Sequence, residues 1–123
     1  MADIKSKNKY DLLERTSSLA KNIIDLCKKL PRNEINKTII FQLVKSATSI
    51  GANYTEADCA ESKKDFIHKL SISRKEAKET MYWLNILKHA MPEHKNECDV
   101  QSRETEELLR IFSTIITKTR NTL

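Results

Sequence analysis

The segment SIGANYTEADCAESKKDF, residues 49–66, joins the interior of one predicted helix to the start of the next. Ser49, Asn53 and Glu56 recur at steps of four and three residues, which places them in one polar stripe of a helix. Further on, Ser62 is followed at the third position by Asp65, just ahead of an apolar pair. This spacing resembles a capping box, in which a hydroxyl accepts a hydrogen bond from a backbone amide at a helix start. The segment therefore predicts a helix, a short turn and a second helix.

Gly51 lies inside the first of these helices, beside an apolar stripe that includes Ile50 and Tyr54. It is the only glycine in the chain. Glycine in a helix interior costs roughly 1 kcal/mol relative to alanine. We therefore expect Gly51 to permit the close approach of another helix rather than to form a turn.

The composition favours helices along the whole chain. Its 123 residues include one glycine and two prolines, with 32% charged residues, whereas a sheet protein needs more turn residues. Apolar residues recur with helical spacing in four segments, and Pro31 and Pro92 end the first and the third. The predicted helices span residues 8–30, 36–58, 63–90 and 99–119. Short connections imply antiparallel neighbours, so we predict an all-α, up-down-up-down antiparallel four-helix bundle, forming one domain over residues 1–123.

The apolar surface is wider than a single bundle core requires. In the helix at 63–90, several apolar residues lie beside the main seam, namely Ile72, Tyr82, Trp83 and Ile86. The helix at 8–30 also has apolar residues on more than one side. Such surfaces need further neighbours, which predicts a homo-oligomer. An alternative to the bundle is an extended helical hairpin that completes its core by oligomerising.

Several classes of function lack their sequence signals. No apolar run is long enough for a membrane span and no secretory signal precedes the helices, so we expect a cytoplasmic protein. Cys27, Cys59 and Cys98 are odd in number and far apart, which indicates neither a disulfide framework nor a zinc site. His94 and Cys98 have a four-residue spacing, but Pro92 and the polar residues around it do not suit a metal site. With no nucleophile motif or phosphate-binding glycine loop, we predict a non-enzyme without catalytic residues, metal or cofactor.

The polar stripe of Ser49, Asn53 and Glu56 has two interpretations. An amide and a carboxylate that converge on one side of a helix can form a recognition or catalytic pair. Alternatively, Glu56 is a buried structural link to Arg74 or Lys78 on the neighbouring helix, fixing the register of the two helices. We favour the structural link, because a buried acid normally requires a partner and that helix has several bases.

Basic residues concentrate in the helix at 63–90, and the whole chain has a net charge of +5. The candidate nucleic-acid-binding residues are Lys63, Lys64, Arg74, Lys75 and Lys78, while Lys69 lies further round the helix. Residues 93–107, by contrast, are rich in acids. A solvated helix surface is the ordinary explanation of such charge runs. We expect Tyr82 and Trp83 to pack among apolar neighbours, which leaves few aromatic platforms for bases.

The segment SIGANYTEADCAESKKDFIHKLSISRKEAKETMYWL, residues 49–84, resembles the signature region of the four-helix-bundle proteins encoded in intervening sequences of bacterial 23S ribosomal RNA genes. The resemblance combines Ser-Ile-x-x-Asn, Ser-x-x-Asp-Phe and a final Tyr-Trp-Leu. It implies a ring-shaped homopentamer. It also implies a relation to the accessory proteins of diversity-generating retroelements, which bind nucleic acid and a reverse transcriptase. Tyr54 and Ala57 depart from the commonest pattern, which has Ile or Val and then Gly at these positions.

Two functions remain after these considerations. The first is a non-enzymatic, homo-oligomeric bundle that binds the phosphates of RNA or DNA through its basic surface. The second is a protein-interaction scaffold without nucleic-acid binding, such as a partner of a reverse transcriptase. The two differ in salt dependence, because binding to several phosphates weakens steeply with salt whereas apolar docking does not.

Overall fold

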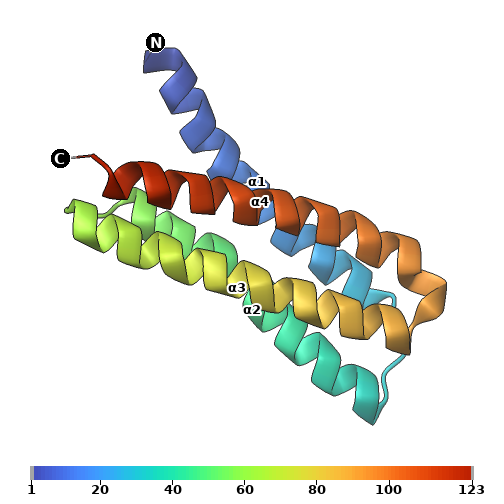
Figure 1. Ribbon diagram of the computed structural model, residues 1–123. Coiled ribbons are helices and arrows are strands. Elements are labelled where there is room, and N and C mark those ends of the chain that lie inside the picture. The colour runs from blue at the N-terminus through green and yellow to red at the C-terminus, as the bar shows by residue number, and fades with distance from the viewer. Residues whose placement is uncertain (1, 123) are drawn as a thin grey trace.

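Between residues 2 and 122 the chain forms four long helices that run back and forth (Figure 1). The structure, a computed structural model, describes the backbone of residues 2–122 and the side chains of residues 12–122. In chain order, its elements are α1 (Ala2–Lys28), α2 (Glu34–Asp58), α3 (Lys63–Ala90), the short 3-10 helix η1 (Pro92–His94) and α4 (Lys95–Arg120). Each long helix runs antiparallel to the one before it, and residues 2–122 contain no strand. The predicted all-α four-helix bundle is confirmed.

The starts of α2 and α3 follow the capping chemistry of the sequence. The side chain of Asn33 accepts a hydrogen bond from the Asn36 amide at 2.8 Å. The hydroxyl of Ser62 accepts one from the Asp65 amide at 3.0 Å, as predicted. Each side chain satisfies a backbone donor that the first helical turn leaves without an acceptor inside the helix.

Two predicted helix starts were wrong by several residues. α1 begins at Ala2 rather than at residue 8, and α4 begins at Lys95 rather than at residue 99. Pro92 occupies the first position of η1, which leads directly into α4. Proline suits a first helical turn, where its missing amide hydrogen has no acceptor to lose. The polar residues ahead of 99 therefore form part of the helical structure.

All four long helices contribute to the core. Fully buried apolar side chains include Ile23, Leu43, Ile50, Leu70, Leu84, Leu87, Leu108, Phe112 and Ile116. The ring of Phe112 in α4 stacks on that of Tyr54 in α2, with centroids 6.0 Å apart. Burial raises the pKa of Tyr54 to about 12. Because burying one large apolar side chain contributes about 1.5–3 kcal/mol, this shared core accounts for the close association of the helices.

Small hydroxyl side chains lie inside the contact between α2 and α3, the most extensive in the described bundle. Ser46 and Thr80 are buried, and their hydroxyl oxygens lie 3.0 Å apart across the two helices. Ser73, also buried, donates a hydrogen bond to the Ile50 carbonyl of α2 at 2.9 Å. These bonds satisfy polar groups that would be costly to bury alone.

Gly51 is the point of close approach between α2 and α1. A Cβ atom placed on Gly51 would lie 3.1 Å from Oγ1 of Thr16 and 3.3 Å from its Cβ. Thr16 is buried, and its hydroxyl donates to the Leu12 carbonyl at 2.9 Å. The expectation that this glycine permits close helix packing, and not a turn, is confirmed.

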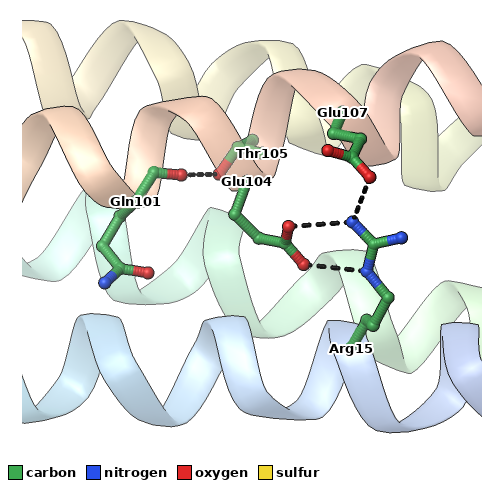
Figure 2. A network of polar contacts seen from close by, with 5 residues as sticks. All are labelled: Arg15, Gln101, Glu104, Thr105 and Glu107. Atoms are coloured by element: carbon green, nitrogen blue, oxygen red, sulfur yellow. Dashed lines mark hydrogen bonds and ion pairs between the residues drawn. The ribbon is translucent and has the colours of Figure 1, made fainter.

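Of the four pairs of neighbouring helices in the described bundle, α1 and α4 have the least extensive contact. The first turns of α1 also project beyond the other helices (Figure 1). Arg15 joins the two helices: it donates to both carboxylate oxygens of Glu104, at 3.0 and 2.8 Å, and to Glu107 at 2.9 Å (Figure 2). The planar fork of a guanidinium suits this bidentate arrangement. A polar clamp thus connects α1 to α4 where apolar packing is sparse.

Candidate nucleic-acid interface

The basic side chains predicted to bind nucleic acid lie on the outer side of α3. We call this set the basic face: Lys63, Lys64, Arg74, Lys75 and Lys78. The four lysines are exposed, and the arginine is half-buried. The offsets of three, eleven and fourteen residues among Lys64, Lys75 and Lys78 are close to whole helical turns, so these three share one side of the helix.

The charges of the basic face are not neutralised within the described part of the chain. None of its five side chains forms an ion pair or hydrogen bond with a described residue. Glu76 follows Lys75 in the sequence and is half-buried. Burial raises the pKa of this carboxyl group, while Lys75 and Lys45 act in the opposite direction.

Lys69 differs from the basic face because it is paired. Its Nζ lies 2.7 Å from Oε1 of Glu56 in α2, and this hydrogen bond raises the pKa of the lysine. The expectation that Lys69 lies further round the helix agrees with this contact. An anionic partner of α3 would therefore meet an already neutralised lysine at this position.

The predicted burial of Glu56 is wrong. Its side chain is 57% exposed, and its partner is Lys69 rather than Arg74 or Lys78. Water remains available to the carboxylate, so no buried charge requires a partner there.

The other two members of the polar stripe bond within their own helix. The Asn53 amide donates to the Ser49 carbonyl at 2.9 Å, and the Ser49 hydroxyl donates to the Lys45 carbonyl at 2.8 Å. Both side chains are half-buried. Side-chain bonds of this kind satisfy local polar groups and do not set the register between helices.

The polar link between α2 and α3 is made by residues outside the predicted stripe. Ser73 and Thr80 of α3 supply it together with Ser46 of α2. A signal was present in the sequence: Ser73 and Thr80 alternate at three and four residue steps with Leu70, Ala77 and Leu84, which are all buried. Small hydroxyl residues in an apolar seam indicate the buried side of a helix.

Several acidic residues of α4 are committed to contacts with other parts of the bundle. Glu97 accepts from Lys29, which directly follows α1, at 2.6 Å and contacts His94 at 2.6 Å. Both interactions lower the pKa of the Glu97 carboxyl group, Lys29 most. Asp99 pairs with Lys88 of α3 at 3.0 Å. Glu104 and Glu107 bind Arg15 of α1 (Figure 2). Negative charge is therefore balanced at these contacts, and the positive charge of the basic face is not.

A second surface feature is an apolar groove between the end of α1 and the start of α2. Its volume is about 930 Å³, and its apolar lining includes Ile24, Ile40, Phe41 and Val44. The Phe41 side chain is 64% exposed. Of the four side chains expected to form surplus apolar surface on the third helix, Tyr82 is exposed, whereas Ile72, Trp83 and Ile86 are half-buried. The most exposed large apolar side chains instead belong to α2, because its first half diverges from α3 (Figure 1).

The described residues contain no group of three or more His, Cys, Asp or Glu side chains that could hold a metal ion. Cys27 and Cys98 are buried, and burial raises the pKa of each thiol to about 11. Among the helices of residues 2–122, none has the length and apolar character needed to cross a membrane.

Comparison with known proteins agrees with the shape of the bundle. The family model described as 23S rRNA-intervening sequence protein matches residues 8–114. A crystal structure of a protein with unknown function from the S23 ribosomal protein family of Bacteroides thetaiotaomicron is 34% identical, with a TM-score of 0.77. The match covers 85% of this chain and 96% of that one. No curated protein matches the chain. From the family match and this structural likeness, the chain belongs to the 23S rRNA-intervening sequence protein family.

Proposed function

We propose that this protein is a non-enzymatic, homo-oligomeric helical bundle that binds the phosphates of RNA or DNA through the basic face of α3. The observation that supports the proposal is the contrast in pairing. The five bases of the face have no partner among the described residues, whereas Asp99, Glu104 and Glu107 are paired with bases of other helices. The proposed location is the bacterial cytoplasm.

The expected mode of binding is electrostatic. Exposed lysines on one side of a helix neutralise phosphates and release counterions, so affinity falls as salt rises. Repetition of the face in an oligomer would increase the local potential further. Phosphate contacts carry no sequence information, so we expect similar affinity for different sequences.

Two matched triple variants test this function. Lys64, Lys75 and Lys78 are changed together to Gln in the first. In the second, the exposed lysines Lys21, Lys95 and Lys118 are changed to Gln, which alters the net charge equally. Exposed substitutions usually change stability by less than about 0.5 kcal/mol, so both variants should fold, as checked by circular dichroism.

Titration of labelled RNA and DNA at several salt concentrations then separates the variants. The first should bind all sequences more weakly, and its salt slope on duplex DNA should fall by roughly one for each lost phosphate contact. The second should resemble the parent. If the first variant retains the affinity and the slope of the parent, the basic face is not the binding site.

The apolar groove favours a second candidate, a protein-interaction scaffold without nucleic-acid binding. Its exposed Phe41 has the kind of apolar surface that an interface covers. Both candidate functions include self-association. That the oligomer is a pentamer is implied by the family resemblance alone. Light scattering should detect an oligomer, and a stable monomer at micromolar concentration would reject it. A relation to retroelement accessory proteins stays a prediction.

A further inference from the structure

We infer that the basic face takes single-stranded nucleic acid in preference to duplex, with one base stacked on the ring of Tyr82. The inference rests on the proposed function, since it specifies which nucleic acid that surface would bind. It arises from a side chain that we expected to pack: Tyr82 is 56% exposed. An exposed aromatic ring beside unpaired lysines is the combination that single-strand binding surfaces use.

The ring of Tyr82 is held in place from one side. It lies against Trp83 in an edge-to-face arrangement, with centroids 5.0 Å apart and planes at 82°. Trp83 is half-buried, and its Nε1 donates to the Glu79 carboxylate at 3.3 Å. Edge-to-face pairs are a favourable geometry for two aromatic rings. Tyr82 is thus supported by an anchored neighbour, which lowers the entropy that a binding base must overcome.

Tyr82 also lies in line with the lysines of the basic face. Lys78 precedes it by four residues and Lys75 by seven, and both offsets keep the side chains on one side of α3. At 1.5 Å per residue, these lysines lie roughly 6 and 10 Å from Tyr82 along the helix axis. A strand that follows α3 can therefore place phosphates at the lysines while presenting a base to the ring.

The aromatic ring is what distinguishes a single strand from a duplex. In a duplex the faces of the bases are covered by their neighbours, so only phosphates and groove edges reach a protein surface. In a single strand the faces are available, and stacking tolerates any base. The lysines serve both forms, whereas Tyr82 adds affinity for the single strand alone.

The test compares three single variants with the parent. Tyr82→Leu keeps apolar bulk without a ring, Tyr82→Phe keeps the ring, and Val100→Ala trims an exposed apolar side chain of α4 outside the basic face. The probes are single-stranded oligothymidylate, oligouridylate and a mixed-sequence duplex of equal length. Trp83 is the only tryptophan in the chain and touches Tyr82, so its fluorescence reports stacking directly.

We expect the parent to bind the single strands more tightly than the duplex and to change its Trp83 fluorescence with single strands only. Tyr82→Leu should lose about fivefold or more in single-strand affinity and none for the duplex. Tyr82→Phe and Val100→Ala should behave as the parent does. Unchanged single-strand affinity in Tyr82→Leu would overturn the inference and leave the phosphate-binding proposal intact. Absence of binding to every probe by the parent would overturn both.

Discussion

Replacing Arg15 with Met tests whether a polar clamp holds α1 against α4. Arg15 is 22% exposed and makes three hydrogen bonds to the carboxylates of Glu104 and Glu107 (Figure 2). Methionine keeps much of the apolar stem and removes the charge. The two carboxylates remain partly open to water, so hydration offsets part of the free energy that they lose with Arg15.

The free energy of unfolding that Arg15→Met should remove lies between two limits. An exposed ion pair contributes about 0–1 kcal/mol, whereas hydrogen bonds to charged groups contribute about 1.5–3 kcal/mol. A bidentate, partly buried clamp should therefore contribute about 1–2 kcal/mol to the free energy of unfolding. For a chain of this length, that corresponds to a fall in Tm of roughly 4–8 °C. Urea unfolding and thermal melting by circular dichroism measure the effect.

A matched control is the pair Arg110 and Glu106, which lies on one helix at 3.3 Å with the Arg110 side chain 74% exposed. Arg110→Met should cost less than about 0.5 kcal/mol. A double-mutant cycle of Arg15→Met with Glu104→Gln should give a coupling near 1 kcal/mol that shrinks as salt is added. If the two arginine variants lose equal stability, or if the Arg15 cycle gives no coupling, the clamp does not hold α1.

Three further outcomes follow from packing and burial. Gly51→Leu should destabilise the protein by about 1–3 kcal/mol through overpacking against α1. Leu in place of the exposed neighbour Ala52 should be tolerated. Equal melting temperatures of the two variants would contradict the close approach of α1 to Gly51. In native protein a thiol reagent should modify exposed Cys59 quickly and buried Cys27 and Cys98 only on unfolding, as mass spectrometry of the labelled peptides can establish. Burial raises the pKa of the Cys27 and Cys98 thiols from 9.0 to about 11. The folded protein therefore favours the neutral thiols, and the stability that they contribute is fully present below pH 9 and is lost as the pH rises through 11. Changing both to Ala should flatten this alkaline decline in urea titrations, and an unchanged slope would exclude the thiols as its cause.

Much of the fold could be predicted because its determinants are local. Helical spacing of apolar residues identified all four long helices, and Ser62 indicated the start of α3. The single glycine indicated a close helix contact, although not that Thr16 would be the residue opposite it. The start of α4 was missed because Pro92 was interpreted only as a terminator, whereas proline also begins helical turns.

The candidate site was less predictable because exposure depends on neighbouring helices. Helical spacing places Glu56 in a stripe, but it does not tell how far α3 covers that stripe, and the carboxylate lies in solvent. Tyr82 sits beside apolar residues in the sequence, yet adjacent positions on a helix differ by about 100° in direction. Tyr82 therefore points outward, whereas Leu84, two positions further along the helix, is buried. The groove near Phe41 depends on the divergence of α2, which no local pattern encodes.

The sparse contact between α1 and α4 also bears on the order of folding. The other three helix pairs are each joined by a short connection, so their contacts close small loops at little entropic cost. Such a chain has a low contact order, which favours rapid folding. Pairing Arg15 with Glu104 spans 89 positions of the chain and adds little apolar contact, so we expect it to form after the rate-limiting step. The loss of this clamp should consequently appear as faster unfolding, with the folding rate nearly unchanged.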